Sequence, residues 1–74
     1  MGRLAGFKYR DVVERLRRLG FVFEWEGAGS HEFWLNPATG ERALVANHRG
    51  DMPEGTLRTM LRQASIEVDA FLAD

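Results

Sequence analysis

The spacing of the apolar residues changes twice along this chain, from a helical period to alternation and back again. Within residues 9–19, apolar side chains recur at helical intervals, and Gly20 follows as a helix stop signal. Residues 53–64 repeat the helical spacing with Leu57, Met60, Leu61 and Ala64 at positions i, i+3, i+4 and i+7. Both segments are therefore predicted to be amphipathic helices, and each needs a surface on which to bury its apolar face.

Three strand-like runs lie between the two helical segments. They cover residues 21–26, 31–35 and 42–46, and turn-forming residues such as glycine, proline and asparagine separate them. Three antiparallel strands in a meander have one apolar face to cover, and the two helices supply that cover. The predicted fold class is α+β in the order α-β-β-β-α, with both helices on one face of the sheet and a short last helix over residues 66–72. The predicted core contains Val12, Leu16, Phe21, Phe23, Leu57, Met60 and Leu61.

Alternation assigns the side chains of the strands to two faces. His31 lies in phase with Phe33 and Leu35, so these three residues are predicted to face the core. Trp34 then points to the other face, where an exposed indole could stack on a base or anchor a partner protein, with packing at the sheet rim as the alternative. The same alternation places three carboxylates together on the open face or at its rim, those of Glu24, Glu26 and Glu32.

The length and composition of the chain limit what it can be. Its 74 residues have room for one domain over residues 1–74 with a modest core. There is no cysteine, and the two histidines with scattered carboxylates do not form a convincing metal site, so we predict no metal and no cofactor. Residues 1–6 hold too short an apolar run for a signal peptide, and no stretch approaches the length of a membrane span. We expect a soluble cytoplasmic protein.

The net charge of −1 argues against a strongly basic nucleic-acid binder, but the charges are unevenly distributed. Residues 1–23 carry six basic and two acidic side chains, whereas residues 24–41 carry four acidic side chains and no basic one. A local basic surface is therefore compatible with the sequence, and the overall charge does not exclude binding to RNA. The basic cluster of the first helix can equally be an ordinary solvated face.

The tripeptide Gly29-Ser30-His31 lies at the turn between the first two strands. Histidine is the side chain that titrates near neutral pH without a perturbing environment, so His31 is the natural candidate for proton transfer. RNA cleavage without a metal needs a base for the ribose 2′-OH proton, an acid for the leaving 5′-oxygen and positive charge near the phosphate. Gly29 lets the backbone pass close to a phosphate, and the Ser30 hydroxyl is a potential donor to it. The competing interpretation of His31 is a hydrogen-bonded, partly buried histidine without a chemical role.

Several short motifs follow one another in a recognisable order. They are Arg10-Asp11-Val12-Val13, Gly20-Phe21-Val22, Gly29-Ser30-His31, Asn36-Pro37, Asn47-His48 and Gly55-Thr56-Leu57-Arg58. Together this set resembles the HicA family of small bacterial ribonuclease toxins over residues 4–72. The resemblance implies a fold like that of double-stranded-RNA-binding domains and a metal-independent endoribonuclease that cleaves mRNA with His31 in proton transfer. It also implies a HicB-like antitoxin that covers the site.

The residues expected to bind the RNA substrate are Gly29, Ser30, Lys8, Arg17 and Arg58. His48 matches a histidine of the family and is an auxiliary candidate, and Trp34 with the acidic rim is expected to contact the antitoxin. The strand before the turn carries Glu24 and Glu26, where members of the family usually have basic residues. This departure keeps a second function class open, a non-catalytic RNA-binding or antitoxin-binding module that kept the fold and lost the basic surface. A structural partner subunit is a weaker third candidate.

Overall fold

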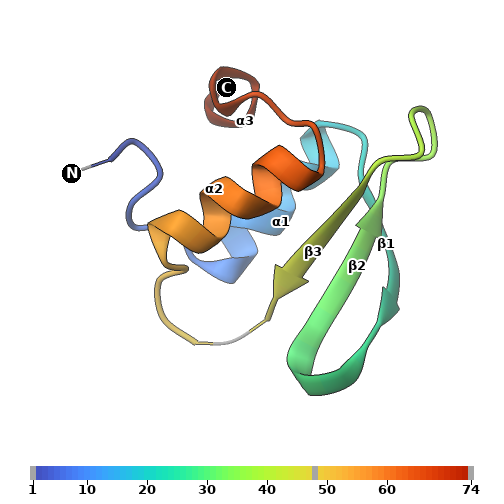
Figure 1. Cartoon of the computed structure of the whole chain (residues 1–74), viewed down its shortest axis with the longest axis horizontal. Coiled ribbons are helices and arrows are strands. Elements are labelled where there is room, and N and C mark those ends of the chain that lie inside the picture. Colours follow the sequence, from blue (N-terminus) through green and yellow to red (C-terminus); the bar gives the residue numbers. More distant parts are fainter. Residues whose placement is uncertain (1, 48, 74) are drawn as a thin grey trace.

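Three antiparallel strands form one open sheet, and helices pack against one of its faces (Figure 1). The computed structural model describes residues 2–47 and 49–73 of the chain. Its helices are α1 (Tyr9–Arg18), α2 (Glu54–Gln63) and α3 (Val68–Leu72), and its strands are β1 (Val22–Glu26), β2 (His31–Leu35) and β3 (Arg42–Ala46). This order confirms the predicted α+β class and the arrangement like that of double-stranded-RNA-binding domains.

The core lies between the helices and the covered face of the sheet. The predicted stripe of α2 is buried, and so is the apolar face of α1 with Val12 and Leu16. The covered face of the sheet adds Trp34, Ala43 and Val45 to the same cluster. The prediction is therefore confirmed for six of the seven core residues, which are Val12, Leu16, Phe21, Leu57, Met60 and Leu61.

The prediction was wrong for Phe23, whose side chain is 50% exposed. A β-bulge interrupts the pairing of β1 with β2, so that Phe23 lies opposite Trp34 and Trp25 lies opposite Phe33. A bulge inserts one extra residue, here Glu24, and shifts the alternation of the strand that contains it. Phe23 and Trp25 consequently lie on opposite faces of β1, and Phe23 remains half exposed because this edge strand is not fully covered by the helices.

The prediction was also wrong about which face of β2 is buried. Glu32 and Trp34 are the buried residues of this strand, with 7% and 1% exposure, whereas His31 is exposed and Phe33 only partly buried. Glu32 and Trp34 lie opposite Val45 and Ala43 of β3, which belong to the covered face. A displacement by one residue moves every side chain of a strand to the other face, so the whole assignment is reversed. Trp34 is therefore not an exposed anchor, and Glu32 is not part of an acidic rim.

Segments that are far apart in the sequence meet on the helical side of the molecule (Figure 1). The ring of Phe7 packs against that of Phe71 in α3, with 5.3 Å between the ring centroids. Lys8 forms an isolated antiparallel bridge with Asp51, and their side chains form an ion pair of 2.7 Å. These contacts bring the start of α1 next to the segment that leads into α2, which is the end of the sheet where β2 begins.

Candidate active site

The turn before β2 has an unusual backbone conformation. Residues Ala28–Ser30 form one turn of 3₁₀ helix, in which Gly29 and Ser30 have φ angles of 63° and 67°. Glycine adopts such angles freely, whereas serine adopts them rarely. Two backbone hydrogen bonds hold the turn, from Gly27 N to His31 O at 2.7 Å and from Asn47 N to Ser30 O at 2.9 Å. The turn therefore fixes the position at which His31 enters the sheet.

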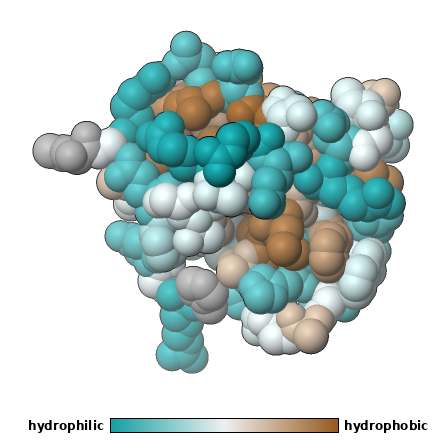
Figure 2. Space-filling model, viewed as in Figure 1, coloured by the Kyte–Doolittle hydropathy of each residue, from teal (hydrophilic) through white to brown (hydrophobic). Residues whose placement is uncertain are grey.

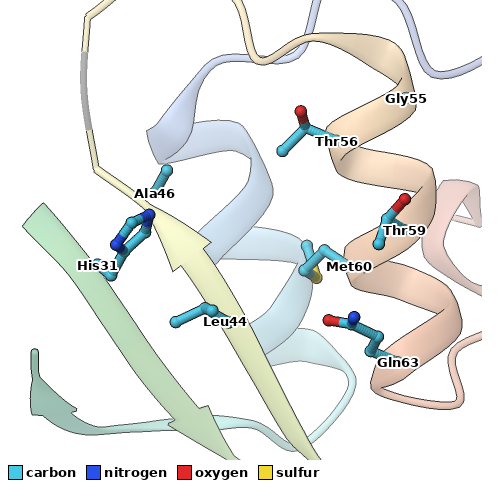
Figure 3. Close-up of a pocket in the computed structure, with 8 residues that line it drawn as sticks. All are labelled: His31, Leu44, Ala46, Gly55, Thr56, Thr59, Met60 and Gln63. Carbon is cyan, nitrogen blue, oxygen red and sulfur yellow. The ribbon is translucent and has the colours of Figure 1, made fainter.

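His31 lies at the edge of a hollow of about 360 Å³, which we call the His31 hollow (Figure 3). Its strand side is formed by His31, Leu44 and Ala46, on the open face of β2 and β3. Its helix side is formed by α2 residues, which are Gly55, Thr56, Thr59, Met60 and Gln63. Figure 3 shows the imidazole on the side of β2 that faces β3 and α2. Because the side chain is exposed and borders a concave site, it is accessible to a substrate.

The acidic residues of the hairpin do not gather around His31. Glu24 accepts two hydrogen bonds from Arg42, at 2.8 Å from Nε and 3.0 Å from Nη2, and these bonds lower the pKa of the Glu24 carboxyl. Glu26 lies opposite Glu32 in the sheet, and Glu32 is buried on the covered face, away from His31. The predicted cluster of three carboxylates on one face is therefore absent, and the one on the open face is paired with an arginine.

The buried carboxylate of Glu32 is held by three neutral donors. Its Oε1 accepts hydrogen bonds from the Tyr9 hydroxyl at 2.6 Å and from the Trp34 indole at 3.1 Å, and its Oε2 accepts one from the Asn47 amide at 3.0 Å. Burial, together with the bond to Glu32, raises the pKa of Tyr9 to about 12. These bonds connect α1, β2 and the segment after β3 directly behind His31. The network explains how a carboxylate can be buried here, since buried polar groups need partners.

Another hollow of about 440 Å³ lies between the start of α1 and the segment after β3, and we call it the Lys8 hollow. Lys8, Arg10 and Arg49 line it, together with Tyr9, Asn47 and Gly50. The consecutive residues Ala46 and Asn47 line the His31 hollow and the Lys8 hollow, respectively. Three cationic side chains thus line the Lys8 hollow, and one of them, Lys8, is paired with Asp51. Arg10 and Arg49 were not predicted from the sequence, because only the folded chain brings the start of α1 to the segment after β3.

The remaining predicted site residues lie elsewhere. The guanidinium of Arg17 lies over the Trp34 ring, 5.1 Å from its centroid. Arg58 lies 3.7 Å from Glu54 on the side of α2 that lines a different hollow together with Arg62. Neither arginine lines the His31 hollow. The auxiliary candidate His48 lies outside the described residues.

Two negative findings concern the described part of the chain. In residues 2–47 and 49–73, no three histidine, cysteine, aspartate or glutamate side chains come together as a metal site would require. No helix within these ranges has the length and apolarity needed to cross a membrane.

The fold and its exposed histidine define a small α+β protein with a concave site at the end of its central strand. Residues 9–66 match the family model described as the HicA toxin of bacterial toxin–antitoxin systems. The chain therefore belongs to the HicA toxin family, and its role is that of a toxin with an antitoxin partner. No match was found among curated proteins.

Proposed function

We propose that this toxin is a metal-independent endoribonuclease that cleaves mRNA in the cytoplasm, with His31 as the proton-transfer residue. The observation that carries the proposal is the exposed His31 side chain at the edge of a hollow, in a chain of the HicA toxin family. The position of the hairpin carboxylates supports it, because Glu32 is buried on the covered face and Arg42 compensates the charge of Glu24. The hairpin therefore offers less repulsion to a phosphate than its sequence alone suggests.

The reaction that fits this site is attack of a ribose 2′-oxygen on the adjacent phosphorus. His31 accepts the proton of the 2′-hydroxyl while the bond from the 2′-oxygen to phosphorus forms. The bond from phosphorus to the 5′-oxygen breaks, and the protonated imidazole returns a proton to that leaving oxygen. The products are a 2′,3′-cyclic phosphate and a free 5′-hydroxyl, so no external oxidant, nucleophile or proton is consumed.

The phosphates would be bound on both sides of His31. The backbone of Gly29 and Ser30 lies immediately before His31, and a Cβ atom added at Gly29 would meet nothing within 4 Å, so the turn is open to a ligand. Lys8, together with Arg10 and Arg49, provides positive charge in the neighbouring Lys8 hollow. Arg17 and Arg58 would make outer contacts with a longer RNA.

Salt dependence separates these two groups of cations. Each lost phosphate contact reduces the slope of log K against log salt by about one unit. The Lys8→Ala, Arg10→Ala double variant should therefore bind a noncleavable RNA with a slope lowered by about two units. The Arg17→Ala, Arg58→Ala double variant has the same loss of formal charge and should change the slope less. Equal slopes for the two double variants would contradict the assignment of the Lys8 hollow.

A direct test uses the purified chain with RNA in the presence of a chelator. The wild type should produce fragments that end in a 2′,3′-cyclic phosphate, and His31→Ala should lower the rate by about 10²–10⁴-fold. His48→Ala tests the auxiliary role of the second histidine in the same assay. The melting curve of His31→Ala should resemble that of the wild type, because His31 is exposed. Undiminished cleavage by His31→Ala would refute the catalytic assignment.

One observation favours a second candidate function, a module that binds RNA or an antitoxin without catalysis. The open face of the sheet exposes large apolar side chains, with Val22, Trp25 and Leu44 each 42–51% exposed. Figure 2 shows hydrophobic side chains gathered over the strands. A HicB-like antitoxin bound to this face would cover His31. If induction of the chain in bacteria leaves both growth and mRNA intact while a complex with the antitoxin still forms, the module is the better description.

A further inference from the structure

On the helix side of the His31 hollow, polar side chains are available to bind a ligand. Thr56, Thr59 and Gln63 line it, and in the described part of the chain their side chains make no hydrogen bond. Figure 3 shows the Gln63 amide extending from α2 toward β3, over the gap that separates the helix from Leu44. A side-chain amide has two donor hydrogens and an acceptor oxygen, so it can bond to a group with an adjacent donor and acceptor.

The rest of the hollow is apolar and concave. Leu44 and Ala46 form its strand side and Met60 lies between the strand and the helix, where its side chain is 3% exposed. The volume of about 360 Å³ is at the lower end of the range for small-ligand sites, which is roughly 300–1,000 Å³. Apolar walls next to the Gln63 amide and two threonine hydroxyls favour a small planar ligand that has an apolar surface and a polar edge.

We infer that the His31 hollow binds one nucleobase of the RNA next to the cleaved phosphate, with Gln63 as the residue that determines which base is preferred. This inference rests on the proposed ribonuclease function. Single-stranded RNA is recognised by bases that leave the stack, pack on side-chain surfaces and form hydrogen bonds through their edges. Each of the four bases presents an adjacent donor and acceptor, and the arrangement of these differs from base to base. An amide that meets the edge of the base from one direction therefore favours the base whose donor and acceptor match it best.

The positions of the two hollows agree with this assignment. The cations of the Lys8 hollow lie beyond Asn47, whereas the His31 hollow is lined by uncharged side chains apart from the histidine. Phosphates are attracted to the cations of the Lys8 hollow, and a base fits the uncharged His31 hollow. A phosphate that follows a base bound in the His31 hollow would lie close to the imidazole, because His31 is at the edge of that hollow.

The first experiment measures cleavage of short RNAs that differ only in the base on either side of one cleavable linkage. The wild type should prefer one base, and Gln63→Leu should change the ratio between the preferred and the other bases by about tenfold. Arg62→Leu is the matched control, because it alters the neighbouring position of α2 outside the His31 hollow. Loss of that charge should slow the cleavage of all RNAs by the same factor and leave the ratio unchanged.

The second experiment does not depend on cleavage. The four nucleoside 3′-monophosphates and ribose 5-phosphate are titrated into the ¹⁵N-labelled protein, and the side-chain amide signal of Gln63 is followed. The signal should shift with the nucleotide of the preferred base and not with ribose 5-phosphate. Equal shifts with all five ligands, or none with any, would overturn the base site.

The outcomes for the two hypotheses are distinct. If cleavage requires His31 but Gln63→Leu keeps the base ratio of the wild type, the base site is wrong and the ribonuclease stands. If no RNA is cleaved in a manner that requires His31, the proposed function is wrong. A selective shift of the Gln63 signal by one nucleotide would in that case still support a base-binding site.

Discussion

The two faces of β2 differ in nearly every physical respect although their residues alternate along five positions. On the covered face, Glu32 and Trp34 are buried, hydrogen-bonded to each other and packed under the helices. On the open face, His31 is exposed and Phe33 stacks on Trp25, with 4.5 Å between the ring centroids and an interplanar angle of 15°. The covered face therefore stabilises the fold, and the open face is accessible to a substrate or a partner.

This division sets a general expectation for substitutions. Changes on the covered face should lower the free energy of unfolding, and any loss of activity should follow from unfolding. Changes on the open face should affect RNA cleavage or antitoxin binding in a protein that remains folded. The total stability of a folded domain is roughly 5–15 kcal/mol, so a loss of a few kcal/mol is a large part of it. Unfolding measurements therefore distinguish a loss of stability from a loss of cleavage or binding in a folded protein.

The largest effect is expected for Trp34→Ala. Trp34 is 1% exposed, its indole donates to Glu32, and Phe23 meets its ring edge-on with 5.9 Å between centroids. Truncation of a buried tryptophan costs roughly 3–5 kcal/mol. Urea denaturation of Trp34→Ala should therefore show a large loss of stability. A loss below about 1 kcal/mol would mean that Trp34 is not in the core.

Substitution of Glu32 should have the next largest effect. Glu32→Ala removes the acceptor of three hydrogen bonds and leaves the buried Trp34 indole without its partner. An unsatisfied buried donor costs about 1–3 kcal/mol. Glu26→Ala is the matched control, since Glu26 lies opposite Glu32 in the sheet but is exposed. Equal stabilities of the two variants would contradict a structural role of the buried network.

The element order of the fold was predictable from the sequence, whereas the faces of the strands were not. The helices were predictable because their apolar stripes are local patterns. Residues four apart, such as Leu57 and Leu61, lie on the same side of any α-helix. Residues 31–35 contain large apolar side chains in both phases of the alternation, so the pattern alone did not decide which phase is buried. Glu32 made the correct phase look unfavourable, because carboxylates are rarely buried without partners. Its partners Tyr9 and Asn47 come from distant segments.

The candidate site was predictable to the same limited extent. His31 could be found because a turn signal and a titratable residue are adjacent in the sequence. Arg10, Arg49 and Gln63 carry no local signal, and only the folded structure brings them to the two hollows beside His31.

A smaller effect is expected from Tyr9, and it depends on pH. The pKa of Tyr9 is raised from 10.0 to about 12 in the folded chain, so the folded state keeps a proton that the unfolded state loses in this range. This contribution to stability is fully present below about pH 10 and is lost as the pH rises to about 12. Tyr9→Phe should lower the free energy of unfolding by about 1 kcal/mol near neutral pH, because the bond to Glu32 is lost. As the pH rises from 10 to 12, the stability of this variant should fall less than that of the wild type.

The titration itself can be observed, because Tyr9 is the only tyrosine of the chain. Near-ultraviolet absorbance should give a midpoint near 12 for the folded protein and near 10 in urea. A midpoint near 10 for the folded protein would show that the Tyr9 hydroxyl is neither buried nor bonded to Glu32.

An effect on stability about as small as that of Tyr9→Phe is expected for Trp25→Ala, which tests the open face. Trp25 and Phe23 are each 50% exposed, but the bulge in β1 places them on opposite faces. Loss of the stacked pair with Phe33 should cost about 1 kcal/mol.

If a HicB-like antitoxin covers the open face, Trp25→Ala should also weaken the complex by about tenfold or more, since exposed aromatic anchors dominate interface energies. Phe23→Ala should change antitoxin affinity much less, because Phe23 lies on the side of Trp34. Calorimetric titration of the antitoxin into both variants measures this difference directly. Equal weakening by the two substitutions would place the antitoxin along the edge of β1 and leave His31 uncovered in the complex, so the complex would still cleave RNA.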